Sequence, residues 1–145
     1  MKWLWLLLCC PFIVNAQTTS PVKWNFKAKK GHEANEYQLI FSAQLDKGFH
    51  VFAPEPGGDG LLIPTSVTLT HPELFTTKSP LIPQRRPVTK EMEGVGYVNY
   101  YEGEIEFILT VHTDKTNTVQ GTLSFQCCNE AMCFPPRDIP FTINL

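Results

Sequence analysis

Three cysteines near the C-terminus, Cys127, Cys128 and Cys133, are the residues of the chain best suited to chemistry. A disulfide needs Cα atoms about 5.5 Å apart, and the four residues between Cys128 and Cys133 let the chain turn back far enough. A bond between the adjacent Cys127 and Cys128 would be strained. The spacing therefore predicts a disulfide between Cys128 and Cys133, which leaves Cys127 unpaired.

The predicted disulfide has two interpretations. The loop that it closes is small, so the bond would stabilise the fold by only about 2 kcal/mol. In the first interpretation the pair cycles, because one thiolate attacks the disulfide of another protein and the second thiol resolves the mixed disulfide. In the other, the bond simply persists at the end of a hairpin after export. The local sequence favours neither interpretation over the other.

A metal site is a third interpretation of the cysteine cluster. Thiols together with an imidazole suit zinc or copper, and the chain has four histidines: His32, His50, His71 and His112. However, the cysteines lack paired C-x-x-C spacing, and no histidine lies near them in the sequence. We therefore expect no metal and no cofactor other than the disulfide itself.

The N-terminus indicates the compartment in which these thiols work. Lys2 precedes an uninterrupted apolar run over residues 3–14, and the following Asn15-Ala16 completes a site that a signal peptidase reads. The run is shorter than the roughly 20 residues of a spanning helix. We predict a signal peptide over residues 1–16 and a mature domain, residues 17–145, that is periplasmic or otherwise exported and not membrane-spanning. Cys9 and Cys10 leave with the signal, which reduces five cysteines to three.

The composition is that of one ordinary globular domain. The 145 residues are 43% hydrophobic and 18% charged, and the formal net charge is -2. A chain so close to neutral has no bulk electrostatic attraction for a phosphate backbone, so we expect no nucleic-acid partner. The 12 prolines argue against long helices.

Apolar and polar residues alternate along most of the mature chain, which predicts half-buried antiparallel strands. Eight short strands are expected, at residues 24–28, 37–45, 49–53, 67–69, 97–101, 105–111, 122–126 and 139–145. Such a series suits a β-sandwich, with irregular loops at residues 54–64 and 79–96. The alternation of Leu123 and Phe125 continues to Cys127, which it places in the core, and points Cys128 outward as the available thiol.

The cysteine segment, residues 125–136 (FQCCNEAMCFPP), resembles the active-site segment of the N-terminal periplasmic domain of the thiol:disulfide interchange protein DsbD family. That segment runs aromatic-Gln-x-Cys, then a short variable stretch, then Cys, an aromatic or aliphatic residue and Pro-Pro. Residues 46–52 are similar to the family's Asp-Gly-aromatic strand, and residues 90–94 are placed like its cap loop. The resemblance covers most of the mature chain in order.

The resemblance implies an all-β, immunoglobulin-like antiparallel β-sandwich with a cap loop over a cysteine pair. It makes Cys128 and Cys133 the catalytic pair. Three aromatic residues, Phe49, Phe52 and Phe134, are expected to border the site.

The cap loop departs from the family pattern at one position. The family usually places a phenylalanine over the disulfide, whereas the matching residue here is Met92, with Glu93 beside it. Methionine is soft and apolar, so we expect Met92 and its loop to limit non-specific reaction of the disulfide.

The resemblance also implies a function. The chain would be an exported thiol-disulfide oxidoreductase of the protein-disulfide reductase type, passing electrons between thioredoxin-fold proteins and oxidised periplasmic partners. The chain ends twelve residues after Cys133, so we expect the electron donor to be another protein, such as a separate membrane electron transporter. The alternative is an immunoglobulin-like binding or interaction module with an inert structural disulfide.

Overall fold

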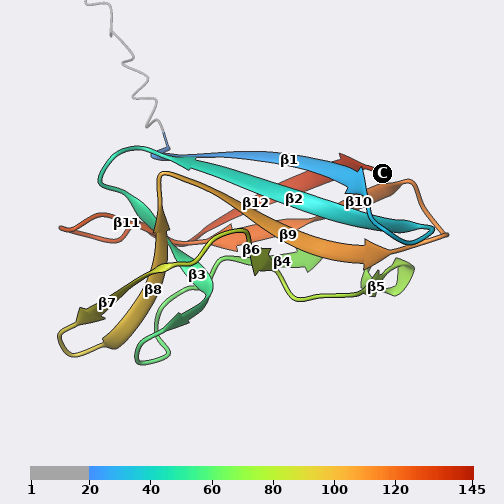
Figure 1. Ribbon diagram of the computed structural model, residues 1–145. Helices are drawn as coiled ribbons and strands as arrows, with labels where there is room; N and C mark the ends of the chain where they lie inside the picture. Colours follow the sequence, from blue (N-terminus) through green and yellow to red (C-terminus); the bar gives the residue numbers. More distant parts are fainter. Residues whose placement is uncertain (1–19) are drawn as a thin grey trace, which may run out of the picture.

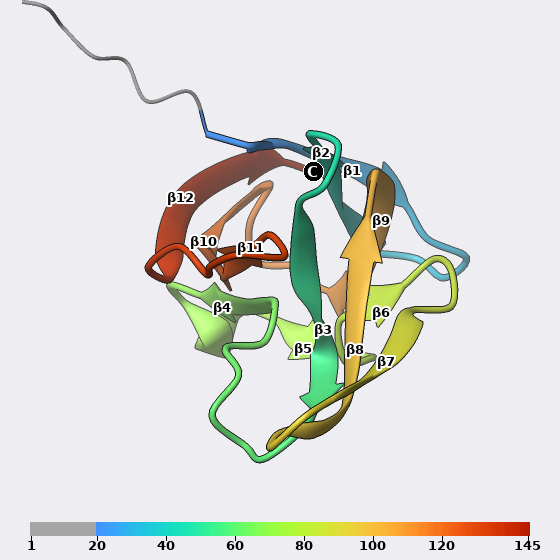
Figure 2. The same ribbon diagram turned by 90° about the vertical axis from the view of Figure 1, so that its left-hand side faces the viewer.

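Antiparallel β-strands form almost all of the structure, a computed structural model that describes residues 20–145. Three sheets contain the strands (Figures 1 and 2). The predicted signal peptide, residues 1–16, lies outside the described residues. The helix found within residues 20–145 is a single 3-10 turn, Pro72–Leu74, and no helix there has the length and apolar character needed to cross a membrane.

Two of the sheets are the layers of a sandwich. The first has the order β1-β2-β9-β5, and β6 also pairs with β9. Its strands are β1 (Val22–Lys30), β2 (Glu36–Leu45), β5 (Thr76–Thr77), β6 (Ile82–Pro83) and β9 (Glu104–His112). The second sheet has the order β12-β10-β4 and consists of β4 (Ser66–Leu69), β10 (Thr118–Phe125) and β12 (Arg137–Asn144).

The main core lies between these two layers, where the inward-facing side chains of their strands meet. Phe41 of β2 meets Phe141 of β12 edge to face, with ring centroids 5.1 Å apart. Gly121 of β10 permits this packing, because a Cβ atom there would lie only 2.6 Å from the Phe141 ring. Burial on one face only is what gives the strands of both layers their apolar and polar alternation.

The third sheet crosses one end of the sandwich, and its order is β11-β3-β8-β7. Its strands are β3 (His50–Gly57), β7 (Val88–Met92), β8 (Gly96–Glu102) and β11 (Cys127–Cys128). Figure 2 looks at this end, with β3 and β8 in front of the sandwich. One face of the sheet joins the main core, and the other carries a separate apolar cluster of Phe52, Val98 and Cys128, here called the outer cluster.

Strand β3 leaves the regular ladder shortly after Phe52. The register with β8 shifts between Phe52 and Gly57, where Pro54 and Pro56 lack the N–H groups that a ladder needs. The buried hydroxyl of Thr65 donates a hydrogen bond of 2.6 Å to the carbonyl of Phe52. This bond holds β3 at the point of departure and thereby positions Phe52 in the outer cluster.

All eight predicted strands are present, and the all-β antiparallel sandwich is confirmed. The segments predicted to be irregular are partly strands, because β3 continues to Gly57, and β6 and β7 lie within residues 79–96. Every residue of β7 is exposed, so this strand carries no apolar and polar alternation for a sequence pattern to detect.

Candidate functional site

Cys128 and Cys133 form a disulfide, with their Cα atoms 3.9 Å apart. Cys128 ends β11, and Cys133 pairs with it as an isolated antiparallel bridge. The four residues between them therefore make a tight hairpin that closes on the bond. The predicted pairing is confirmed, and Cys127 is free.

Asn129 holds this hairpin in shape. Its backbone N–H donates to the carbonyl of Met132 at 2.9 Å. Its side-chain oxygen accepts from the N–H of Ala131 at 2.9 Å and from that of Met132 at 2.8 Å. Because none of these bonds involves sulfur, we expect the two thiols to remain close together after the disulfide is reduced.

The two bonded cysteines differ sharply in exposure. Cys128 is only 1% exposed, whereas Cys133 is exposed at the surface of the hairpin. The prediction that Cys128 is the available thiol is wrong. Cys128 does point away from the main core, as the alternation indicated, but the outer cluster covers that second face of the sheet. The accessible sulfur of the pair is therefore that of Cys133.

Cys127 lies on the opposite face of β11 and is a core residue, as predicted. It pairs with Val51 of β3 and is 4% exposed. Burial, assisted by the negative charge of Asp46, raises the pKa of the Cys127 thiol to about 11. At neutral pH Cys127 is therefore a protonated thiol without nucleophilic character.

The Cys127 thiol is expected to resist alkylation in the folded, reduced protein. With a pKa of about 11, its thiolate fraction at pH 7 is about one in 10⁴, some 300-fold below that of an ordinary cysteine. Iodoacetamide labelling followed by peptide mass spectrometry should find Cys133 modified and Cys127 free. Labelling of Cys127 at a rate similar to that of Cys133 would contradict its placement in the core, and labelling in denaturant is the control.

Aromatic residues border the hairpin on the side of β3. The rings of Phe49 and Phe134 lie 6.0 Å apart, one before β3 and the other just after Cys133. The N–H of Phe134 donates to the carbonyl of Cys127 at 2.9 Å, which ties the exit of the hairpin to β11. Together with Phe52 of the outer cluster, all three aromatic residues predicted to border the site are brought to it.

His50 also belongs to the site, although no sequence motif marks it as a neighbour of Cys128. It is the cross-strand partner of Cys128, and its ring lies 4.6 Å from that of Tyr100. Burial lowers the pKa of His50 below 6.5, the nearby carboxylate of Glu102 partly opposes this effect, and the ammonium of Lys90 adds to it. The folded state therefore favours the neutral imidazole.

This lowered pKa makes the stability of the fold depend on pH. The unfolded chain binds a proton at His50 near pH 6.5, whereas the folded protein does so only at lower pH. The contribution of His50 to stability is thus present above pH 6.5 and is lost as the pH falls through that value. Urea unfolding should show a steeper loss of stability on acidification for the wild type than for His50→Gln, and equal slopes would contradict this prediction.

The remaining histidines lie away from the cysteine pair. His32 is in the turn between β1 and β2, His71 bonds to Glu73, and His112 ends β9. In the part of the chain that the structure describes, no group of three or more His, Cys, Asp or Glu side chains is arranged to hold a metal ion.

Met92 and Glu93 lie at the end of the β7–β8 hairpin. Met92 pairs with Gly96, which lies six residues along β8 from Glu102, the partner of His50. At about 3.3 Å per residue this is roughly 20 Å along the strand. The tip of the hairpin is clear of β11 in both views (Figures 1 and 2). The structure does not bring these two residues to the disulfide, and their shielding role stays a prediction that requires the hairpin to bend toward β11.

Another residue of the same turn, which no sequence pattern marks, does reach the outer cluster. Val95 is partly buried and packs against it, together with Leu62 and Tyr100. The turn between β7 and β8 is thus anchored by Val95, while Met92 is 39% exposed. Val95 is a single apolar residue in the turn, so no alternation pattern in the sequence predicts that it is partly buried.

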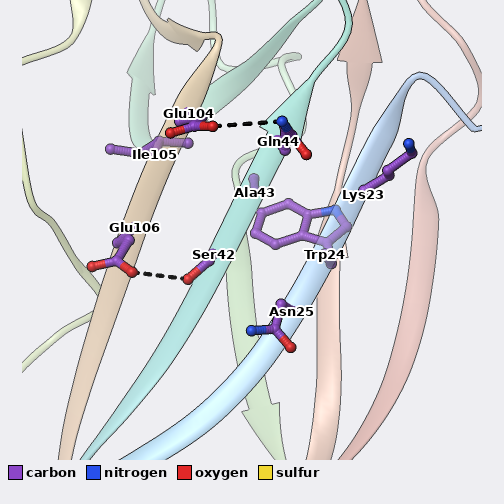
Figure 3. A pocket seen from close by; sticks show the side chains of 9 residues that line it. All are labelled: Lys23, Trp24, Asn25, Ser42, Ala43, Gln44, Glu104, Ile105 and Glu106. Atoms are coloured by element: carbon purple, nitrogen blue, oxygen red, sulfur yellow. Dashed lines mark hydrogen bonds between the residues drawn. The ribbon is translucent and has the colours of Figure 1, made fainter.

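A hollow of about 390 Å³ lies on the first sheet (Figure 3). It is lined by Lys23, Trp24, Asn25, Ser42, Ala43, Gln44, Glu104, Ile105 and Glu106. Ser42 donates to the carboxylate of Glu106 at 3.0 Å, and Gln44 donates to that of Glu104 at 3.5 Å. Both carboxylates are exposed and bonded within the sheet, as is typical of a solvated strand face.

Comparison with known proteins identifies a family. The family model described as "Thiol:disulfide interchange protein DsbD, N-terminal" matches residues 16–144. No curated protein matches the sequence.

Three solved structures show the same immunoglobulin-like fold. The N-terminal periplasmic domain of ScsB from Proteus mirabilis has a TM-score of 0.60 at 17% identity, over 85% of this chain and 45% of that one. The DsbD N-terminal domain of Neisseria meningitidis in the reduced form has a TM-score of 0.51 at 19% identity, over 77% of this chain and 78% of that one. The GAE domain of GGA2p from Saccharomyces cerevisiae has a TM-score of 0.50 at 13% identity, over 86% of this chain and 91% of that one. The chain thus spans less than half of the ScsB chain that it matches.

Proposed function

Because the chain belongs to the family of the DsbD N-terminal domain, we propose that it is an exported thiol-disulfide interchange module that works through a reversible Cys128–Cys133 disulfide. The observation that carries this proposal is the asymmetry of the pair. Cys133 is exposed, whereas Cys128 is 1% exposed behind it. Such a disulfide offers an incoming thiolate one sulfur and withholds the other.

Reduction of the module requires two thiols from a donor. The donor's first thiolate attacks the Sγ atom of Cys133, a mixed disulfide forms, and the Cys133–Cys128 bond breaks with its electron pair on Cys128. The thiolate of the donor's second cysteine then attacks the sulfur of the donor's first cysteine in the mixed disulfide and releases Cys133. Two electrons and two protons have passed to the module, and the donor is left with a disulfide.

Onward transfer follows the same path in reverse. The thiolate of Cys133 attacks the disulfide of an oxidised acceptor, and Cys128 then attacks the Sγ atom of Cys133 and releases the reduced acceptor. The Asn129 turn supports this second step, because it keeps the two sulfurs adjacent while one of them is bound to another protein.

The proposed partners are thioredoxin-fold proteins, with a separate membrane electron transporter as the original source of electrons. A Cys-x-x-Cys pair supplies the two neighbouring thiols that the reaction needs. Exposed apolar residues flank Cys133 in the sequence, since Met132 is 54% exposed and Pro135 and Pro136 are exposed as well. A partner with an apolar surface around its reactive cysteine would fit these residues.

Direct transfer between purified proteins tests the proposal. The oxidised module is mixed with an equimolar amount of reduced thioredoxin, samples are quenched in acid, and free thiols are counted by mass after alkylation. We expect Cys128 and Cys133 to gain two thiols as thioredoxin loses two. A module that stays oxidised under these conditions would favour the alternative of a binding domain with an inert disulfide, and a Cys133→Ala variant controls for exchange at Cys127.

A further inference from the structure

His50 of β3 lies directly opposite Cys128 of β11. Side chains opposite one another on antiparallel strands share a face, with Cβ atoms about 4.5–5.5 Å apart. On its other side His50 pairs with Glu102 of β8. The remaining members of the outer cluster, Phe52 and Val98, are apolar. A titratable side chain therefore lies beside the one sulfur of the pair that solvent does not reach.

Breaking the disulfide creates a charge at this buried sulfur. Attack on Cys133 leaves the electron pair on Cys128, which is 1% exposed and faces apolar side chains. An unpaired anion in such surroundings is unfavourable, and burial raises the pKa of a thiol. The leaving sulfur thus needs a proton as the bond breaks, and water has little access to supply it.

We propose that His50 transfers a proton to the Cys128 sulfur when the disulfide is reduced and takes it back on reoxidation. The inference rests on the proposed function only in that the disulfide cycles. An incoming thiolate forms a bond with Cys133, the Cys133–Cys128 bond breaks, and the imidazolium of His50 protonates the sulfur of Cys128. His50 becomes neutral and regains its proton from solvent, to which its partly exposed ring has access.

Among the groups near Cys128, His50 is the one suited to transfer a proton at neutral pH. Cys128 faces it from β11, Glu102 and Tyr100 from β8, and the charge of Lys90 acts on it from β7. Histidine is the side chain that ordinarily exchanges its proton near neutral pH. Burial favours the neutral imidazole, the carboxylate of Glu102 partly opposes this effect, and the Lys90 ammonium adds to it. The share of His50 that carries the proton to be transferred therefore grows as the pH falls.

The pH dependence of reduction by a small monothiol tests this proposal without any partner protein. Oxidised wild type, His50→Gln and His50→Phe are mixed with glutathione between about pH 5.5 and 8, the range in which histidine titrates. Each rate constant is divided by the concentration of glutathione thiolate. For the wild type this corrected rate should rise as the pH falls, and both variants should lose the rise, with a deficit of about tenfold to a hundredfold at the lowest pH.

Matched variants separate proton transfer from packing. His50→Phe retains an aromatic ring against Tyr100 and His50→Gln retains hydrogen-bonding capacity, so the loss of the rise in both variants points to the imidazole proton. His32→Gln, in the distant β1–β2 turn, should keep the wild-type profile. Glu102→Gln should keep the rise but move its midpoint to lower pH. Thermal unfolding confirms that each variant is folded.

Two different results would overturn the proposal, and they are distinguishable. A wild-type profile in either His50 variant would remove His50 from the reaction and leave the interchange function intact. A wild-type disulfide that glutathione fails to open at any pH would contradict the proposed function itself.

Discussion

Replacement of Cys128 by alanine is expected to turn the protein into a trap for its redox partner. The exposed Cys133 thiol can then still attack a disulfide of the partner, but the thiol that would resolve the mixed disulfide is gone. Cys133→Ala should trap at least about a hundredfold less, because the remaining Cys128 is buried and reactivity follows access to the thiolate. The probe is a thioredoxin variant that has only its attacking cysteine, carried beforehand as a mixed disulfide with thionitrobenzoate, which the attacking thiolate of the module displaces. Non-reducing gels and mass spectrometry measure both yields.

The comparison is best made in a Cys127→Ala background, which removes the third thiol. Both variants lose the same disulfide, which stabilises the fold by about 2 kcal/mol, so a difference in stability does not explain a difference in trapping. Equal trapping by the two variants would show that Cys128 is as accessible as Cys133, and the directional mechanism would be wrong.

Replacement of Phe52 by alanine is expected to damage the site and the fold together. Phe52 is 2% exposed and forms the outer cluster with Val98 and Cys128. Truncating a buried phenylalanine lowers the free energy of unfolding by about 3–5 kcal/mol. The cavity would also open the covered side of Cys128, so its alkylation in the reduced protein should accelerate. Urea unfolding and timed labelling measure the two effects.

Phe41→Ala is the matched control for this experiment. Phe41 is fully buried in the main core, so its truncation should lower stability by a similar amount. It has no place in the outer cluster and should leave the labelling rate of Cys128 unchanged in the folded protein. If both variants accelerate labelling equally, global unfolding rather than local cover controls access to Cys128.

The sandwich was predictable because strands that are buried on one face have alternating apolar and polar residues in the sequence. In β9, Ile105, Phe107 and Leu109 are buried while Glu104 and Glu106 are exposed, and this contrast marks the strand. Strand β7 has no such contrast because all of its residues face solvent. Strand β7 forms because its backbone pairs with that of β8, and the sequence pattern does not predict this pairing.

The cysteine pair was predictable for a different reason, since local spacing and one specific motif were enough. The exposure of Cys128 and Cys133 was not predictable, because alternation indicates which face of the sheet a residue is on and not whether other side chains cover that face. His50 escaped notice because it is 78 residues from Cys128 in the sequence, and only the pairing of β3 with β11 brings the two together. Met92 shows the reverse case. Its place in the motif suggested that it lies over the disulfide, but the register of β7 with β8 places it far along the strand.

The reduction potential of the Cys128–Cys133 disulfide tests the central claim most directly. Equilibration with thioredoxin or glutathione buffers, followed by alkylation and mass analysis in a Cys127→Ala background, gives this value. A pair that exchanges electrons with thioredoxin-fold proteins should lie between about -270 and -120 mV, the span of thioredoxin and its more oxidising relatives. A value below about -300 mV, as in structural disulfides of secreted proteins, would contradict the claim that this bond cycles.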